Sequence, residues 1–253
     1  EAAANESPIH TVTLSAYKMT KFEITAAEYK KCVTAGFCNA AGSDTACTYD
    51  VTGKENHPIN CVDWYQATAY CRWVNGDLPT EAQWEYAARG ATYSKYPWGD
   101  TLTSNRSNYW QSSDPFDSTV DPYTQNGGPT TPVGYYNGLL QGPYQTLDNK
   151  SPFGLYDVSG NVWEWIKDWY KSDFYSQCNN ECIDPLNNIP TTYKAVRGGG
   201  WIDNSKYLRV ASRSYHNTSY NYDAHIGFRC TSSPAKFITN SWVDIPGGTF
   251  RMG

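Results

Sequence analysis

Three segments of the chain combine helix-start signals with apolar residues at helical spacing. Each segment opens with a capping box, in which two side chains and two backbone N–H groups bond reciprocally. The three boxes are Thr25 with Glu28, Asp63 with Gln66, and Thr80 with Gln83. The pattern predicts helices that end near residues 35, 75 and 89, because a glycine follows each of these positions and readily ends a helix.

The second of these helices has one apolar face. Trp64, Ala67, Cys71 and Val74 recur at helical spacing along it. Cys71 is therefore expected to point into the core.

The remainder of the chain is rich in Gly, Pro, Asn, Ser and Tyr, with only short strand-like stretches. Three of these are Thr11–Leu14, Trp163–Ile166 and Leu208–Ala211. Short strands, long loops and a few helices predict an α+β domain of low regularity. Residues Asn39–Asn56 and Gln177–Thr192 are predicted to be loop insertions.

The last residues, Trp242–Gly253, have the pattern of an opening strand and turn that should precede Glu1. We therefore expect one circularly permuted domain over residues 1–253, with 242–253 as its first strand and 231–241 as a linker. A cut taken out of phase from a tandem array is the alternative, and both require adjacent ends. Permutation is favoured because a domain without this strand would leave a sheet edge unpaired.

Six sequence blocks carry a resemblance to a known family. They are Asn5-Glu-Ser-Pro-Ile-His10, Leu78-Pro-Thr-Glu-Ala-Gln-Trp-Glu-Tyr-Ala-Ala-Arg-Gly90, Tyr96-Pro-Trp-Gly99, Gly154-Leu-Tyr-Asp-Val-Ser-Gly-Asn-Val-Trp-Glu-Trp165, Arg197-Gly-Gly-Gly-Trp201 and Gly227-Phe-Arg-Cys230. In this order they resemble the formylglycine-generating-enzyme-like, or sulfatase-modifying-factor, domain. The resemblance implies a divergent C-type-lectin-like fold.

Composition narrows the class of protein. The chain has 253 residues, of which 40% are hydrophobic, and its 10 Trp and 21 Tyr supply large apolar areas for a core. A formal charge of -5 offers no basic stripe for nucleic acid. No apolar run approaches the length of about 18 residues that a membrane span needs.

The eight cysteines favour disulfides in an oxidising compartment, since they form neither paired CxxC motifs nor a Cys/His zinc pattern. Cys178 and Cys182 are expected to close a small loop. Two bridges among four further residues remain open in three pairings: Cys32, Cys38, Cys47 and Cys61. The family resemblance implies a bond between Cys71 and Cys230.

Enzymatic relatives suggest an alternative. Formylglycine-generating enzymes oxidise a substrate cysteine with copper held by two cysteines just after the block that matches Arg197–Trp201. Here that stretch reads Ile202-Asp-Asn-Ser-Lys-Tyr-Leu-Arg209 and holds no cysteine. Soft thiolates select Cu(I), and the oxygens of Asp203 and Asn204 do not replace them. The four histidines likewise show no helical pair of the kind expected at an iron site.

The stretch from Asp157 to Glu164 suits a hard cation. Two carboxylates flank a glycine turn, and carboxylate and carbonyl oxygens are the ligands that calcium prefers. The resemblance implies a structural calcium held by the side chains of Asp157 and Glu164 and the carbonyls of Gly160 and Val162. A second family site maps onto Asn108, Tyr109, Asp121 and Tyr123.

The segment from Trp201 to His225 is rich in Tyr, Asn, Ser and His, the composition of adaptable recognition loops. It resembles the variable region that retroelement-diversified proteins display on the same framework. We predict a ligand surface of Trp201, Asp203, Asn204, Tyr207, Tyr215, His216, Asn217, Tyr220, Tyr222 and His225.

These observations predict a ligand-binding module without a catalytic residue. The expected ligand is a protein or a glycan, and neither nucleic acid nor a membrane span is expected. The module should be secreted or on the cell surface, with a periplasmic or lipid-anchored precursor as variants of that location. An oxygen-dependent formylglycine-type oxidase or protein-maturation enzyme is the main alternative.

Overall fold

The three predicted helices are present and begin at their capping boxes. The computed structural model describes residues 3–116, 130–178, 181–220, 223–234 and 241–253. Within them α1 spans Ala26–Thr34, α2 spans Trp64–Trp73 and α3 spans Glu81–Arg89, and each N-cap side chain accepts from the backbone N–H three residues on. Short 3-10 turns lie at Ala4–Glu6, Ser104–Arg106, Phe174–Gln177 and Ser205–Leu208.

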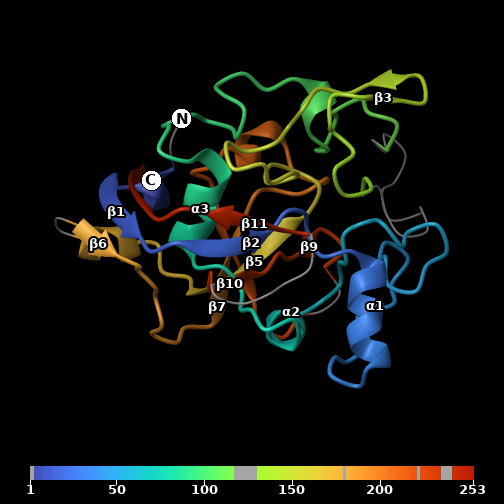
Figure 1. Ribbon diagram of the computed structural model, residues 1–253, viewed down its shortest axis with the longest axis horizontal. Helices are drawn as coiled ribbons and strands as arrows, with labels where there is room; N and C mark the ends of the chain where they lie inside the picture. Colours follow the sequence, from blue (N-terminus) through green and yellow to red (C-terminus); the bar gives the residue numbers. More distant parts are fainter. Residues whose placement is uncertain (1–2, 117–129, 179–180, 221–222, 235–240) are drawn as a thin grey trace.

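The strands are short and form several small sheets (Figure 1). One described sheet has the order β12-β1-β6, from Gly248–Met252, His10–Leu14 and Glu181–Ile183. A second has the order β10-β2-β11, from Thr231–Ser232, Tyr17–Thr20 and Trp242–Ile245. A small hairpin pairs β3, Leu140–Gln141, with β4, Tyr144–Gln145.

The largest described sheet positions the candidate site. Its order is β8-β7-β5-β9, built from Arg213–Asn217, Tyr193–Arg197, Trp163–Trp169 and Ile226–Gly227. Strand β8 therefore lies at an edge, next to β7 alone. The α+β prediction is confirmed by this mixture of short strands and three helices.

The last strands complete sheets that begin at the N-terminal end. β12 pairs antiparallel with β1, from His10 opposite Met252 to Leu14 opposite Gly248, and β11 pairs with β2. Gly253 packs against the backbone of residues 6–9, and Figure 1 shows both chain ends on the same side.

Three local predictions differ from the structure. The expected linker opens with β10, because Thr231 pairs with Met19, and 235–240 lie outside the described residues. The expected insertion after residue 177 contains β6, which runs parallel to β1. The stretch Leu208–Ala211 is a turn, because the backbone N–H of Val210 bonds to the Lys95 carbonyl instead of to a strand.

All eight cysteines form disulfides. The predicted pairs Cys71–Cys230 and Cys178–Cys182 are present, and the open question in the insertion resolves to Cys32–Cys38 and Cys47–Cys61. Cys71 lies on the inward face of α2, in a core cluster that includes Tyr29, Trp165 and Phe228. No helix among the described residues is long and apolar enough to cross a membrane.

Candidate functional site

Trp201, predicted as a ligand contact, is a core residue. Only 4% of its surface is exposed, and its indole N–H donates to the Ala224 carbonyl at 3.0 Å. It packs in a small cluster with Cys47, Cys61 and Ala224. Trp201 therefore supports the segment from beneath and has no free surface for a ligand.

Asp203 is also tied to the framework. Its carboxylate accepts from the Trp163 indole N–H at 2.6 Å and from the Gly200 backbone N–H at 3.0 Å. Burial raises the pKa of Asp203, against the opposing effects of His225 and these hydrogen bonds. Asp203 is thus an anchored, half-buried acid.

The strand geometry divides the predicted surface between two faces of a sheet. Successive residues of a strand point to opposite faces, so Tyr215 and His216 of β8 separate. Tyr215, 48% exposed, lies 4.5 Å from the Tyr170 ring and 4.9 Å from the Tyr193 ring. His216 packs on the other face against the Trp165 ring. The nine predicted residues that the structure describes therefore do not form one continuous surface.

His216 and His225 are joined by one carboxylate. Asp223 contacts His216 Nε2 through one oxygen and lies 3.4 Å from His225 Nδ1 through the other. Burial alone would raise the pKa of Asp223. The hydrogen bond from His216 and the nearby His225 outweigh burial and hold this pKa below its usual range. Burial lowers the pKa of His225, although the Asp223 and Asp203 carboxylates oppose that shift.

Other predicted residues surround this group. Tyr220 is 49% exposed, and its ring lies 5.6 Å from that of His216. Asn204 and Asn217 are exposed, whereas Tyr207 is half-buried against the Trp163 ring. Tyr222 lies outside the described residues.

Sequence reasoning missed four contributors. Asp223 was not predicted, although its place between two histidines was a usable signal. Trp110 is 50% exposed, and its backbone N–H donates to the Asp203 carbonyl at 3.0 Å, which sets an aromatic ring beside the segment. Tyr170 and Tyr193 join Tyr215 only through the register of β5, β7 and β8, which the sequence does not reveal.

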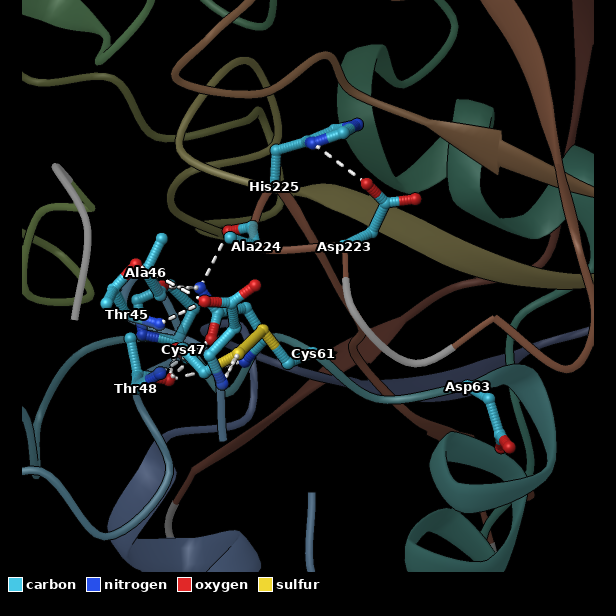
Figure 2. The surroundings of a disulfide bond; sticks show 12 residues. Thr45, Ala46, Cys47, Thr48, Cys61, Asp63, Asp223, Ala224 and His225 are labelled. Carbon is cyan, nitrogen blue, oxygen red and sulfur yellow. Dashed lines mark hydrogen bonds and ion pairs between the residues drawn. A yellow bond between two sulfur atoms is a disulfide. The ribbon is translucent and has the colours of Figure 1, made fainter. Parts of the chain in front are cut away.

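The insertion before α2 supports the end of the segment. Figure 2 shows the Cys47–Cys61 disulfide and the Thr45–Thr48 loop next to Ala224 and His225. The Cys61 backbone N–H donates to the Asp223 carbonyl at 3.2 Å, and the Asn60 side chain donates to that of Ala224 at 2.6 Å.

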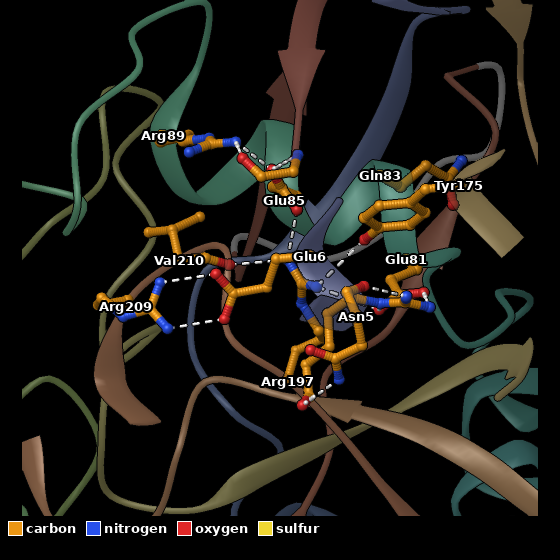
Figure 3. Close-up of polar contacts among 12 residues, drawn as sticks. Asn5, Glu6, Glu81, Gln83, Glu85, Arg89, Tyr175, Arg197, Arg209 and Val210 are labelled. Atoms are coloured by element: carbon orange, nitrogen blue, oxygen red, sulfur yellow. Dashed lines mark hydrogen bonds and ion pairs between the residues drawn. The ribbon is translucent and has the colours of Figure 1, made fainter. Parts of the chain in front are cut away.

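A buried ion-pair network fixes the start of the segment (Figure 3). Arg209 makes two hydrogen bonds to the Glu6 carboxylate, at 2.8 and 2.6 Å. Arg213 makes two to Glu81, at 2.7 and 2.9 Å, and Glu81 also pairs with Arg197. The two arginines are thus framework residues that hold this part of the chain to the core.

The predicted calcium turn has a conformation that few residues tolerate. Asp157, Gly160 and Asn161 all have positive φ, of 59, 91 and 65°. A Cβ on Gly160 would lie 2.2 Å from Ser107 Oγ and 2.4 Å from the Asn108 carbonyl oxygen, so only glycine fits. Gly160 of the first predicted calcium set therefore lies against Asn108 of the second. Asp121 and Tyr123 lie outside the described residues, and Tyr109 is half-buried.

The charge around this turn favours a cation. Glu23, Asp157 and Glu164 are buried near one guanidinium, that of Arg229, which makes two 2.7 Å hydrogen bonds to Glu164. Asp157 has no ion-pair partner among the described residues. Burial, together with the two neighbouring carboxylates, raises the pKa of Glu23 well above its usual range, and burial also raises that of Asp157.

An unsatisfied oxygen lies beside Asp157. The Asn149 amide donates to the Asp157 carboxylate at 3.1 Å, and the buried Oδ1 of the same amide has no hydrogen-bond partner. No three His, Cys, Asp or Glu side chains in the described ranges are arranged to hold a metal. These oxygen donors fit a hard cation such as calcium.

Comparison with known proteins gives one family. A family model described as "Sulfatase-modifying factor enzyme 1-like domain" matches residues 1–234. The formylglycine-generating enzyme of Streptomyces coelicolor is 37% identical over 190 residues, covering 72% of this chain and 55% of that protein. The enzyme of Thermomonospora curvata is 38% identical over 195 residues, covering 73% and 58%. The chain thus spans just over half the length of these relatives.

Solved structures show the same fold. Treponema denticola variable protein 1 superposes with a TM-score of 0.61 at 22% identity, covering 89% of this chain and 87% of that one. PvdO from Pseudomonas aeruginosa superposes with a TM-score of 0.63 at 20% identity, covering 86% and 80%. The α+β, C-type-lectin-like fold expected from the sequence motifs is confirmed.

Proposed function

Because this chain belongs to the sulfatase-modifying factor enzyme 1-like family, we propose that it uses the family fold as a ligand-binding module. The contact surface is the group of His216, Tyr220 and His225 with the neighbouring Trp110 and Asn204. Exposed aromatic rings give contact area at low entropic cost, and the imidazoles and amides give hydrogen bonds. The ligand is a protein or a glycan.

The state of the cysteines carries this proposal. All eight are in disulfides, and the segment that holds the copper-binding pair in formylglycine-generating enzymes has Asp203 and no cysteine. These two observations support a binding role over copper chemistry, which needs a free thiolate pair. One structural neighbour with this fold is named a variable protein, which agrees with a display role for the segment.

Binding is tested with an immobilised sample of the protein, probed with a glycan array and a displayed peptide library. For a selected ligand, Tyr220→Ser and His216→Ala should each weaken binding by about tenfold, the effect of losing a central contact. Tyr65→Ser is the matched control, since Tyr65 is 55% exposed on α2. Equal binding by all three variants and the parent would place the ligand elsewhere.

The alternative is an oxygen-dependent formylglycine-type oxidase or another protein-maturation enzyme, which the 37–38% identity to such enzymes favours. The two functions separate in one assay. An oxidase should bind copper stoichiometrically and consume oxygen with a cysteine-containing peptide. A binding module should do neither.

A structural calcium at Asp157 and Glu164, with the Gly160 and Val162 carbonyls, is part of the proposal. Calcium would neutralise the buried acids and lock the Gly160 turn, which joins the 108 loop to β5. The module is proposed to work in an oxidising compartment, as a secreted or cell-surface protein, because four disulfides persist there. Thermal unfolding in calcium and in chelator tests the metal.

A further inference from the structure

Both ends of the loop from Thr218 to His225 are bonded to one short stretch, residues 60–64. The Trp64 backbone N–H donates to the Thr218 carbonyl at 3.2 Å, at the start of the loop. At its end, the Cys61 backbone N–H donates to the Asp223 carbonyl, also at 3.2 Å. The described parts of the loop, 218–220 and 223–225, are therefore held by a segment more than 150 residues away in sequence.

Both polar atoms of the Asn60 side-chain amide are hydrogen-bonded at this junction. It is fully buried, and its Oδ1 accepts from the Thr48 backbone N–H at 2.7 Å and the Thr48 hydroxyl at 3.0 Å. Its Nδ2 donates to the Ala46 carbonyl at 2.9 Å and the Ala224 carbonyl at 2.6 Å. One amide thus joins the 46–48 loop to the residue between Asp223 and His225.

The Cys47–Cys61 disulfide ties the 46–48 loop to the 60–64 stretch. Its two cysteines pack with Trp201 and Ala224, and Trp201 is the second donor to the Ala224 carbonyl. Cys61 has a φ of 54°, a left-handed conformation that a residue with a side chain rarely adopts. Surrounding contacts must hold such a residue in place, and here they include the bonds from Gly42 to the Cys61 carbonyl and from Cys61 to Asp223.

We infer that Asn60 and the Cys47–Cys61 disulfide are positioning residues for the His216–Asp223–His225 group, so that ligand binding requires this disulfide to be oxidised. The inference rests on the proposed binding function for its biological meaning. The effect of the disulfide and Asn60 on the position of the loop does not require a ligand. Reduction would free the 46–48 loop and loosen Asn60. The Asp223 and Ala224 carbonyls would then lose the hydrogen bonds from Cys61 and Asn60 that hold the chain before His225.

The chain supplies a matched control disulfide. Cys32–Cys38 is also buried, belongs to the same part of the chain and closes a short loop, but it packs in the cluster around α1 and α2. A purely stabilising role would make the two disulfides equivalent for the 218–225 loop. A positioning role makes only Cys47–Cys61 matter to it.

The test is hydrogen–deuterium exchange of the whole protein, read at the Cys61 and Trp64 amides and the Trp201 indole N–H. The variants are Cys47→Ser with Cys61→Ser, Cys32→Ser with Cys38→Ser, and Asn60→Asp. Asn60→Asp keeps the acceptor for Thr48 and removes both donors. Amides of the β1–β12 pair report general destabilisation.

The Cys47/Cys61 variant and Asn60→Asp should speed exchange at the three reporters by about tenfold relative to β1–β12, as loss of a buried hydrogen bond implies. The Cys32/Cys38 variant should leave that ratio unchanged. Equal acceleration by both disulfide variants, or none with Asn60→Asp, would overturn the inference. Should the cysteine variant fail to fold, Asn60→Asp decides. No ligand is needed, so failure of the binding function gives a separate result.

Discussion

Replacing Arg229 should show how much the pairing of its guanidinium with the buried acids contributes to the free energy of unfolding. Arg229 and Glu164 have fully buried side chains joined by two hydrogen bonds of 2.7 Å. Arg229 also donates to the Tyr156 carbonyl at 2.9 Å and the Thr20 carbonyl at 3.2 Å. Arg229→Met keeps much of the volume, removes these donors, and leaves Glu164 charged and unpaired beside Glu23.

In the metal-free protein, breaking a buried pair in this way costs about 3–5 kcal/mol of unfolding free energy, because an uncompensated charge remains. At roughly 2–4 °C per kcal/mol for a chain of this size, the midpoint of thermal unfolding should fall by about 6–20 °C. Urea unfolding with intact disulfides measures the free energy, and calorimetry measures the midpoint.

An exposed ion pair provides the control. Lys18 and Asp244 lie 2.6 Å apart, with side chains 21% and 79% exposed, and such pairs contribute about 0–1 kcal/mol. Lys18→Met should therefore change little. Arg229→Met combined with Glu164→Gln should recover part of the loss, since the buried charge is gone. If Arg229→Met cost no more than Lys18→Met, the electrostatic reasoning about this site would be wrong.

Three further outcomes follow from other features. Loss of the Cys71–Cys230 disulfide, which has a sequence separation of 159, should cost about 5 kcal/mol of unfolding free energy in urea. Loss of Cys178–Cys182, with a separation of 4, should cost about 2 kcal/mol. The difference arises because a disulfide that closes a longer loop removes more entropy from the unfolded state. Burial lowers the pKa of Lys194 to about 8, so the folded state binds fewer protons than the unfolded state above that pH. Stability should then rise from pH 8 to 10, and Lys194→Met should flatten the rise. The raised pKa of Asp157 means that metal-free stability should fall as pH rises above about 4, so stabilisation by calcium should grow with pH and shrink in Asp157→Asn.

Local signals sufficed for the helices and failed where tertiary contacts decide. Thr25, Asp63 and Thr80 specify their helices through side chains three residues away, so the sequence contains the whole motif. The stretch after Leu208 alternates half-buried and buried residues like a strand, but the Val210 N–H bonds to the Lys95 carbonyl and the stretch belongs to no strand among the described residues. Strand formation depends on a partner, which local sequence does not specify.

The arrangement of the side chains within residues 201–225 was not predictable from the sequence. Composition marked residues 201–225 without saying which side chains face solvent. The alternation of β8 could have separated Tyr215 from His216, had the strand boundary been known. The burial of Trp201 depends on Cys47 and Cys61, which come from a distant insertion.

The pairing of β12 with β1 and of β11 with β2 also governs the order of folding. Val12, Leu14 and Met19 are almost fully buried, yet the strands that pair beside them lie more than 220 residues later in the sequence. Contacts so distant along the chain make folding slow. During synthesis, β1 and β2 must wait for residues 242–253 with their edges open, and open strand edges favour aggregation. Until then the chain depends on short-range elements such as the three capped helices.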